Sequence, residues 1–350
     1  VSANGGFDCI IGNPPYVQTG KIGYTIEHPY RTINCGDLFG ICMDRSFQLM
    51  NKRSSFGMII PLSGASSNKM TELTKLIYEQ GKTWISYYSA SDQPSSLFNG
   101  VRHRLMIPLI KKSSATECYS TNFLKWFSEG RNHLFESMLK YQAYSEKNNF
   151  NWNCKVSSNS ESNALGKLFI NKNLGQHFRK RGKVMYYHDA PVHWGKIFDF
   201  VPEYWKGNVQ KRSSHLKDIS FENNTIRDLT IGFLNSSLFY WFNWQYTNCR
   251  DLTKGNIEIS RFDPTSVSEE LQENIKEAKN KLMTDLKLNS KKYTRVSNNV
   301  RTTFDSFYPA KSKPIIDQID TFLAEHYGFT EEELDFIINY DIKFRMGKTL

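Results

Sequence analysis

The 350-residue chain lacks the cysteine pattern of a disulfide-rich or zinc-binding protein. Its six cysteines are scattered and form no Cys-x-x-Cys pair, which excludes a zinc ribbon and a disulfide framework. His103, His188, His193 and His215 show no metal-ligand spacing, and no acidic nuclease cluster is followed by a lysine. The sequence therefore predicts a protein of a reducing cytoplasm that binds no metal.

Long apolar runs are also missing. No stretch approaches the roughly 20 residues that a bilayer-spanning helix needs, and the first residues lack the basic and apolar regions of a signal peptide. The sequence predicts no membrane partner. The first residue is Val1 rather than Met, which predicts either processing or a longer polypeptide.

Positive charge is in excess and unevenly distributed. The net charge is +10 and the pI is about 9.1. From residue 311 onward there are five Lys or Arg against eight Asp or Glu, so residues 1–310 carry +13. This balance favours a polyanionic partner such as nucleic acid.

The first part of the chain alternates between strand-like and helix-like patterns. Apolar runs predict strands, and apolar residues at helical spacing predict helices between them. Such a βαβαβ order is typical of a doubly wound α/β sheet buried on both faces. The predicted strands are residues 7–11, 56–62, 84–89 and 104–110, and the predicted helices are residues 37–52 and 69–80.

Composition predicts three parts. The α/β pattern ends in a polar stretch near residue 113, so residues 1–115 form the first domain. Residues 116–310 are rich in Asn, Ser and aromatic residues, which predicts an α+β domain of loops and short strands. Residues 311–350 predict a C-terminal helical pair, in which Thr330 and Glu333 form a capping box.

The sequence NPPY at residues 13–16 follows the first strand directly. Ligands of open α/β sheets bind at the carboxyl ends of the strands. Two consecutive prolines fix the backbone and remove two N–H donors, so the segment is a rigid wall of acceptors. The Asn13 side-chain carbonyl and the Pro14 backbone carbonyl could accept both hydrogens of a conjugated amino group and direct its lone pair at an electrophile. Tyr16 would supply a stacking face for the ring that carries this group.

These residues resemble the catalytic motif of the S-adenosylmethionine-dependent N6-adenine DNA methyltransferases of restriction-modification systems. The resemblance covers FDCIIG at residues 7–12 with the NPPY that follows, DLF at 37–39, GMIIP at 57–61 and LFNGV at 97–101. These stretches occur in the order and approximate spacing of that family. The resemblance implies that residues 1–115 are the C-terminal half of a Rossmann-like catalytic domain.

The resemblance also implies roles for individual residues. Asn13, Pro14, Pro15 and Tyr16 would form the catalytic motif, with Asn13 and Pro14 binding the exocyclic amine. Tyr16 would stack on an adenine flipped out of the duplex, because the amine of a stacked base pair cannot be reached in line. Phe98 would pack on the same base from another side.

For the cofactor, the resemblance implies that Pro15 and Leu38 lie near the adenosine of S-adenosylmethionine. The family places its Gly-rich cofactor loop on strands before the NPPY motif, and only six residues precede Phe7. The expectation is therefore an incomplete sheet, whose missing cofactor-binding half comes from the same polypeptide or from a partner subunit.

The stretches LNSSLFY at residues 234–240, DL at 251–252 and NYDIKFRM at 339–346 resemble recurring stretches of the target-recognition domains of restriction-modification enzymes. The resemblance implies that residues 116–310 form such a domain and that double-stranded DNA is a partner. A basic loop with an interspersed aromatic residue, QHFRKRGK at residues 176–183, is typical of a phosphate-contacting segment. Arg179, Lys180 and Arg181 are the candidate DNA-binding residues.

Two alternatives remain open at this point. An amide or another amino group poses the same chemical problem, so a protein glutamine methyltransferase or an RNA guanine methyltransferase is one alternative. The long basic, aromatic-rich region after residue 115 argues against both. The other alternative is a non-catalytic or split-enzyme DNA-binding chain. The recognition sequence does not follow from composition, because base contacts depend on geometry. The oligomeric state is left open, and any endonuclease activity would lie upstream.

Overall fold

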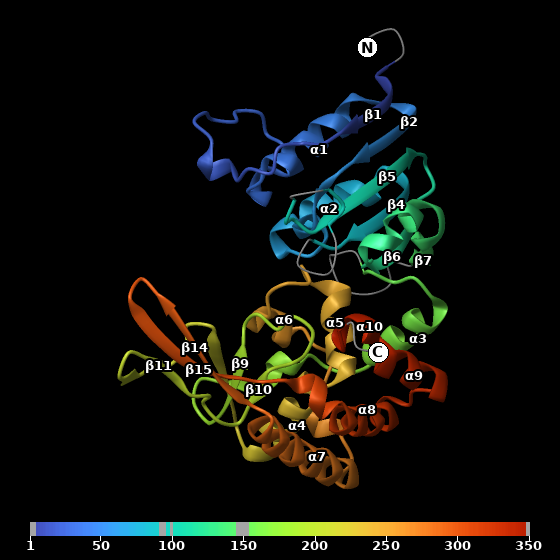
Figure 1. Ribbon diagram of the computed structural model, residues 1–350. Coiled ribbons are helices and arrows are strands. Elements are labelled where there is room, and N and C mark those ends of the chain that lie inside the picture. The colour runs from blue at the N-terminus through green and yellow to red at the C-terminus, as the bar shows by residue number, and fades with distance from the viewer. Residues whose placement is uncertain (1–4, 91–95, 99–100, 145–153, 348–350) are drawn as a thin grey trace. The chain divides into compact units, whose positions relative to one another are not determined.

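The structure is a computed structural model that describes residues 5–90, 96–98, 101–144 and 154–347 (Figure 1). The chain divides into two compact units. Unit 1 comprises residues 1–159 and 244–248, and unit 2 comprises residues 160–243 and 249–350. Each unit is described by itself.

Unit 1 is built on a mixed sheet with the strand order β1-β2-β5-β4-β6-β7, in which the short strand β3 also pairs with β5. β1 and β2 are parallel, as are β4 and β6, whereas β5 runs antiparallel to β2 and to β4. Its strands are β1 (Phe7–Gly12), β2 (Met50–Met58), β3 (Ile60–Pro61), β4 (Gly81–Tyr88), β5 (Leu105–Lys112), β6 (Glu117–Leu124) and β7 (Gln142–Tyr144).

Two helices of unit 1 lie where the apolar spacing predicts them. α1 spans Leu38–Leu49 and buries Phe39, Ile41 and Met43 among others. α2 spans Thr71–Tyr78 and buries Leu73, Leu76 and Ile77. The predicted strand at residues 56–62 begins six residues earlier, at Met50, because β2 follows α1 directly.

The prediction of a sheet buried on both faces is wrong for β1. Five of its six residues are exposed, and within the described residues its only strand neighbour is β2. The apolar run alone cannot distinguish a central strand from an edge strand, since both have the same composition. The sheet is also mixed rather than uniformly parallel, because β5 enters between β2 and β4 in the opposite direction.

Unit 2 contains two four-stranded antiparallel sheets. Their strand orders are β10-β9-β13-β8 and β12-β11-β15-β14. The strands are β8 (Phe178–Arg179), β9 (Lys183–His188), β10 (Ile197–Phe198), β11 (Tyr204–Lys206), β12 (Val209–Gln210), β13 (Leu216–Phe221), β14 (Lys291–Ser297) and β15 (Val300–Ser306).

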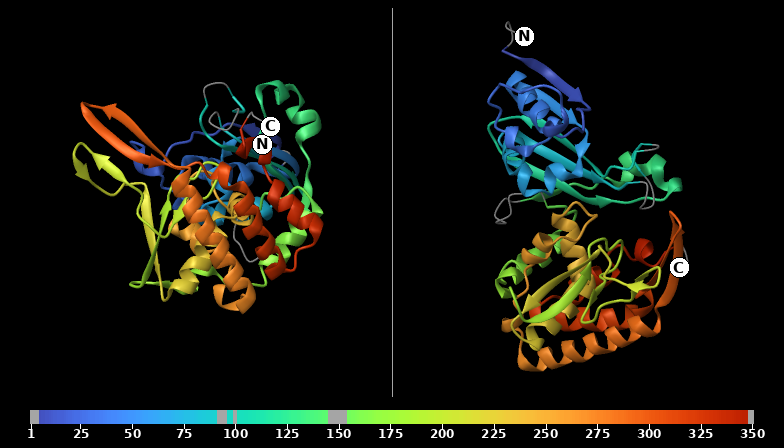
Figure 2. Two further views of the ribbon diagram at one scale, coloured as in Figure 1. Left: turned by 60° about the horizontal axis from the view of Figure 1, so that its bottom comes forward. Right: turned by 90° about the vertical axis from the view of Figure 1, so that its left-hand side faces the viewer.

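Helices form the rest of unit 2, and α4, α7 and α8 pack side by side (Figure 2). The helices assigned after residue 150 are α3 (Asn159–Leu168), α4 (Asn224–Asn235), α5 (Ser237–Tyr246), α6 (Lys254–Glu258), α7 (Glu269–Leu288), α8 (Lys313–Tyr327), α9 (Glu331–Asn339) and α10 (Ile342–Arg345). The last residues of α5 belong to unit 1. The interpretation of residues 116–310 as loops and short strands missed α7, which is 20 residues long.

The C-terminal capping box is confirmed. The Thr330 hydroxyl accepts a hydrogen bond from the Glu333 N–H at 3.2 Å, and the Glu333 carboxylate accepts one from the Thr330 N–H at 2.8 Å. The domain boundaries at residues 115 and 310 stay predictions. In space, β6 and β7 extend the first sheet beyond residue 115, and α8 to α10 belong to unit 2.

None of the helices in the described residues combines the length and apolar character needed to cross a membrane. Within the same residues, no group of three or more His, Cys, Asp or Glu side chains lies close enough together to hold a metal ion.

The buried carboxylate of Asp320 joins α8 to the start of α5. It accepts hydrogen bonds from the backbone N–H groups of Ser237 at 3.1 Å and Leu238 at 3.0 Å, donors that have no partner inside their own helix. Arg345 donates to the Ser237 hydroxyl at 3.1 Å and lies over the Trp194 ring, 3.9 Å from its centroid. The packing of unit 2 therefore depends on a buried polar group.

This arrangement predicts a pH-dependent stability. Burial raises the pKa of Asp320 to about 6, against the opposing hydrogen bonds from Leu238 and Ser237 and the charge of Arg345. An unfolded Asp has a pKa of about 3.9, so the folded state holds the proton more tightly. The stability from this group is present below the unfolded pKa and is lost as the pH rises through about 6. Two pKa units correspond to about 3 kcal/mol.

The test compares the wild type with Asp320→Asn, which cannot titrate. We expect the unfolding free energy of the wild type, measured by urea denaturation, to fall relative to that of Asp320→Asn as the pH rises from about 4 to about 7. Asp335→Asn, at an exposed position of α9, is the control and should show no such shift. A parallel pH dependence of wild type and Asp320→Asn would contradict the prediction.

Candidate active site

The NPPY segment lies at the carboxyl end of β1. β1 ends at Gly12, whose carbonyl accepts a hydrogen bond from the Ile59 N–H at 3.1 Å. The chain then leaves the sheet through Asn13, Pro14 and Pro15 without regular structure; Pro14 is buried, and Asn13 and Pro15 are exposed. Because the prolines fix the backbone, the Asn13 side chain projects from a rigid, accessible strand end.

Tyr16 is held in a fixed orientation. Its hydroxyl donates to the Ile59 carbonyl at 2.9 Å, and its ring meets that of His103 edge-on, with centroids 6.0 Å apart. The side chain is half-buried, and burial raises the pKa of the Tyr16 hydroxyl above its ordinary value. The ring therefore remains neutral and is anchored at its hydroxyl end.

An apolar cluster joins Tyr16 to the segment that contains Phe98. Tyr16 and Ile59 pack against this cluster, whose buried members are Tyr88, Leu97, Leu105, Leu124, Trp126 and Leu134. The Arg131 guanidinium donates to the carbonyls of Ser96 at 2.9 Å and Leu97 at 2.7 Å. Phe98, next in the chain, is 41% exposed. Tyr16 and the Phe98 segment thus border one cluster, and Asn99 and Gly100 lie outside the described residues.

The start of α1 is tethered to the end of the NPPY segment. The Leu38 N–H donates to the Val17 carbonyl at 2.9 Å, and Gln18 forms an isolated β-bridge with Asp37. Leu38 is buried. Burial raises the pKa of the Asp37 carboxyl, opposed by the charge of Lys69. The structure therefore places the backbone of Leu38 next to Val17, the residue that follows the NPPY segment.

β1 leaves apolar side chains in solvent. Ile11 is 81% exposed and Phe7 44% exposed, although β1 is paired in parallel with β2. Parallel strands are ordinarily covered on both faces, and an exposed apolar edge strand is a template for pairing with another chain. The edge of β1 is therefore suited to contact with further protein.

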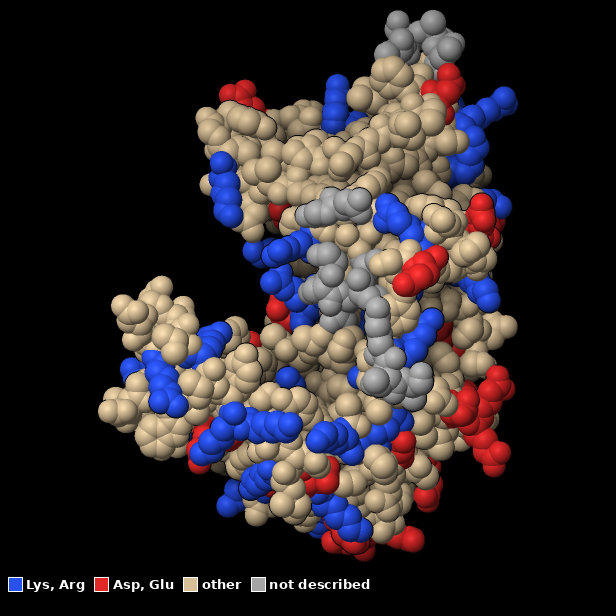
Figure 3. Space-filling view, viewed as in Figure 1, with Lys and Arg blue, Asp and Glu red and all other residues tan. Residues whose placement is uncertain are grey.

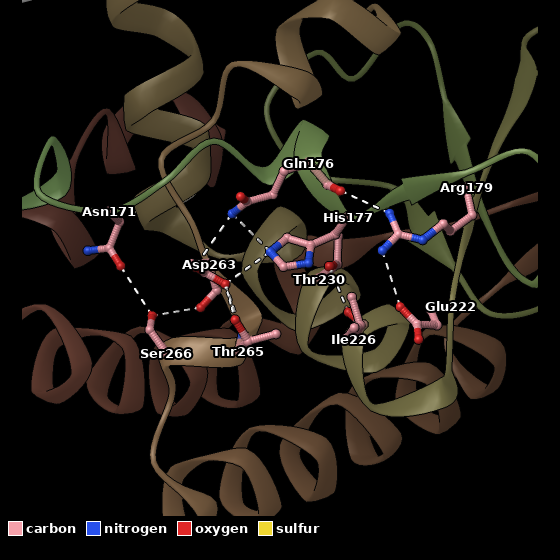
Figure 4. Close-up of polar contacts among 10 residues, drawn as sticks. All are labelled: Asn171, Gln176, His177, Arg179, Glu222, Ile226, Thr230, Asp263, Thr265 and Ser266. Carbon is pink, nitrogen blue, oxygen red and sulfur yellow. Dashed lines mark hydrogen bonds and ion pairs between the residues drawn. The ribbon is translucent and has the colours of Figure 1, made fainter.

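The three basic residues predicted to contact DNA lie in unit 2, where Arg179 ends β8 and Lys180 and Arg181 follow it in the turn before β9. Arg179 donates to Glu222 at 3.1 Å and to the Gln176 carbonyl at 2.9 Å (Figure 4). It also donates to the Phe178 carbonyl, so it forms part of the local structure. Lys180 and Arg181 are exposed. Gly182 follows with φ 147° and packs against the Phe221 carbonyl. DNA contact by these residues stays a prediction.

A buried pair lies beneath this loop. His177 Nε2 is 2.9 Å from an oxygen of Asp263 (Figure 4). Burial acts to raise the pKa of Asp263, but hydrogen bonds from Thr265 and the interaction with His177 outweigh it and leave the pKa below its ordinary value. The pair connects two segments of unit 2 that are 86 residues apart, and we assign it a structural role.

Three residues that contact Tyr16 or the Phe98 segment escaped prediction from the sequence. His103, Ile59 and Arg131 come from segments far from NPPY in the chain, and their contacts with Tyr16 or the Phe98 segment depend on sheet order. Ile59 lies within GMIIP, one of the stretches that resemble the methyltransferase family, and this position was the signal that could have indicated a role at the site. His103 and Arg131 have no local signature.

A family model described as Eco57I restriction-modification methylase matches residues 1–92. A search of curated proteins finds no match. The matched range includes the NPPY segment, the start of α1, and the strands β1 to β4.

Several solved structures are similar to this chain. The type IIL restriction-modification enzyme MmeI in complex with DNA has a TM-score of 0.47 at 10% identity, covering 98% of this chain and 57% of that one. The ATP-dependent type ISP restriction-modification enzyme LlaBIII bound to DNA has a TM-score of 0.41 at 10% identity, covering 97% and 36%. The DrdV–DNA complex has a TM-score of 0.34 at 12% identity, covering 53% and 22%. The chain therefore spans between 22% and 57% of the length of these proteins.

Proposed function

We propose that this chain is part of a site-specific DNA methyltransferase that transfers a methyl group to the N6 amino group of an adenine flipped out of double-stranded DNA. The observation that carries the proposal is the rigid NPPY segment at the end of β1, with an exposed Asn13 and a Tyr16 ring anchored by the Ile59 carbonyl. The match of residues 1–92 to a restriction-modification methylase family supports it.

In the proposed reaction, the Asn13 side-chain carbonyl and the Pro14 backbone carbonyl accept hydrogen bonds from the adenine amine. These bonds hold the nitrogen lone pair toward the methyl group and stabilise the positive charge that grows on nitrogen as the new C–N bond forms. The extra proton on nitrogen then leaves to solvent. Tyr16 stacks on the base, and Phe98, partly exposed beside the same apolar cluster, packs on it from another side.

The proposed cofactor is S-adenosylmethionine, which supplies an activated methyl group on a sulfonium. We propose that Pro15 and Leu38 lie near its adenosine. The hydrogen bond from the Leu38 N–H to the Val17 carbonyl supports this, because it holds the start of α1 beside the end of the NPPY segment. We propose that the rest of the cofactor site belongs to a further part of the polypeptide or to a partner subunit that covers β1. The exposed Ile11 and Phe7 support such a cover.

The test is a methyl-transfer assay with tritiated S-adenosylmethionine, using the protein as its own gene encodes it. Genomic DNA that lacks adenine methylation, total RNA and a protein extract serve as separate acceptors. We expect label in DNA alone, recovered as N6-methyladenine after digestion. Label in RNA or protein would reject the DNA proposal in favour of a guanine or glutamine methyltransferase.

A DNA-binding chain without catalysis is the second candidate, and the basic surface of unit 2 described below favours it. The same protein would then shift duplex DNA in a gel without transferring label. Binding of S-adenosylmethionine, measured by calorimetry, separates the two candidates, since only the methyltransferase requires it.

A further inference from the structure

The β14–β15 hairpin, here called the ribbon, projects from unit 2 (Figures 1 and 2). Its two strands pair over seven residue pairs, from Lys291 opposite Ser306 to Ser297 opposite Val300. Asn298 and Asn299 form the two-residue turn with φ 48° and 60°, the left-handed conformation of a type I′ hairpin. Every residue of β14 is exposed, so this strand has no buried face.

Contacts within its own sheet stiffen the ribbon. The Phe304 ring lies 6.4 Å from that of Tyr204 and 5.6 Å from that of Tyr293, and the hydroxyls of Thr294 and Thr303 are 3.0 Å apart. Such cross-strand pairs are the main source of stability in a sheet. The ribbon is therefore stabilised by contacts within its own sheet.

A second, shorter hairpin points the same way. β11 and β12 are joined by Gly207 and Asn208, and the Gly207 N–H donates to the Arg301 carbonyl at 2.7 Å. Both turns therefore lie at one end of the sheet. Beyond this level residues 296–301 continue as a two-stranded extension, in which Val296 is 70% exposed.

The ribbon and its neighbour concentrate positive charge. Residues 291–306 contain four Lys or Arg and one Asp, and residues 203–212 contain three Lys or Arg and one Glu. These 26 residues hold a net charge of +5, half of the +10 of the whole chain. Figure 3 shows Lys and Arg side chains on this projecting sheet, at the lower left.

Some of these cations are already paired. Lys292 binds Glu203 at 2.7 Å, and Arg212 binds Asp218 at 2.6 Å. For Lys206 and Arg301, no ion pair with a carboxylate is present among the residues that the structure describes. Both are exposed and lie near the turns, so their charges face solvent at the projecting end.

Charge and shape together select the partner. Four cations without an acidic residue across residues 291–304 would repel a second copy of the same strand, whereas they attract a polyanion. A two-stranded ribbon fits the major groove of B-DNA, which is about 12 Å wide. Asn side chains can pair with the adenine edge in that groove, and Asn298 and Asn299 lie at the tip.

We propose that the ribbon enters the major groove of duplex DNA, with Lys206 and Arg301 contacting phosphates and the Asn298–Asn299 turn facing the base edges. The proposal rests on the proposed function, since it assumes a DNA substrate. It assigns base contacts to the ribbon, whereas the sequence predicted phosphate contacts for the loop with Arg179, Lys180 and Arg181.

The first experiment removes the phosphate contacts. Lys206→Ala combined with Arg301→Ala is compared with Lys276→Ala combined with Lys281→Ala on α7, which removes the same charge from a different surface. Binding to a random-sequence duplex is followed by fluorescence anisotropy at several salt concentrations. We expect the ribbon variant to bind roughly tenfold more weakly, with a salt slope shallower by about 2. The α7 variant should stay within about twofold of the wild type.

The second experiment separates recognition of the base sequence from electrostatic attraction to the phosphates. Asn299→Gly removes the side-chain amide but keeps a residue that accepts φ 60°, so the turn is preserved. A pool of duplexes with a randomised core is selected on the wild type and on Asn299→Gly, and the enriched sequences are compared. We expect equal affinity for random DNA and a loss of selectivity at one or more positions.

Each outcome decides the proposal. If the wild type methylates DNA but the ribbon variant binds like the α7 variant, the ribbon assignment is overturned and the proposed function stands. If the wild type neither binds nor methylates DNA, both fall together. Thermal unfolding checks that all variants fold. If the wild type forms a dimer in the absence of DNA and the ribbon variant does not, the ribbon binds a second copy of the chain instead of DNA.

Discussion

Replacing Asn13 by Ala is expected to lower the rate of methyl transfer by roughly 100- to 1,000-fold, the cost of removing one preorganised group that stabilises developing charge. Asn13 is exposed at the end of β1, so its loss should leave the fold intact. DNA affinity should change little, because the proposed DNA-reading elements belong to unit 2. Single-turnover kinetics with saturating DNA measure the chemical step directly.

Asn13→Asp is the matched variant for this experiment. It has the same shape and keeps an acceptor oxygen but replaces the amide nitrogen, so it should retain more activity than Asn13→Ala. Equal activity of Asn13→Ala and the wild type would reject the proposed role of the NPPY segment. Equal loss in Ala and Asp, with unchanged thermal stability, would show that the amide nitrogen, rather than the carbonyl, is required.

The sequence predicted local features of unit 1 well because they depend on short-range patterns. The apolar run before Gly12 forms β1, and the segment in which Leu38 and Ile41 have helical spacing forms α1. The prediction that β1 is buried was wrong, because the position of a strand in a sheet depends on which strands pair with each of its edges. Composition cannot reveal that Ile11 would be 81% exposed.

Unit 2 shows where local reasoning was incomplete. α7 has an N-cap at Ser268 and buried residues at helical spacing, including Leu271 and Ile275, so periodicity applied to this segment would have found it. The ribbon is different. β14 has no buried face and therefore no alternation of apolar and polar residues. The remaining signals were Tyr293, Thr294 and Val296 before the Asn-Asn turn.

The candidate site was predictable only in part. The two prolines of the NPPY segment indicate a rigid backbone, so Asn13 and Tyr16 could be selected as site residues from the sequence. The anchoring of Tyr16 joins residues 43 positions apart, and the support of the Phe98 segment by Arg131 spans 34. Such contacts are set by strand order, which the chain encodes only through its complete fold.

The anchoring of Tyr16 gives the second large expected effect. Tyr16→Ala removes the stacking surface, and stacking of a base on an aromatic side chain is worth about 1–3 kcal/mol. We expect kcat/KM for methyl transfer to fall roughly 10- to 100-fold. Tyr16→Phe keeps the ring and loses only the hydrogen bond to the Ile59 carbonyl, so its activity should stay within a few-fold of the wild type.

Base extrusion provides a readout that a purely structural role of Tyr16 would not affect. With 2-aminopurine in place of the target adenine, a flipped base changes its fluorescence when an aromatic ring stacks on it. The wild type and Tyr16→Phe should give the same quenched signal, because the ring is present in both. Tyr16→Ala should leave the flipped base brighter, since flipping persists without a stacking partner. If Phe and Ala lose activity equally while both fold, the hydroxyl bond to Ile59 rather than the ring surface is what Tyr16 contributes, and the stacking role is rejected.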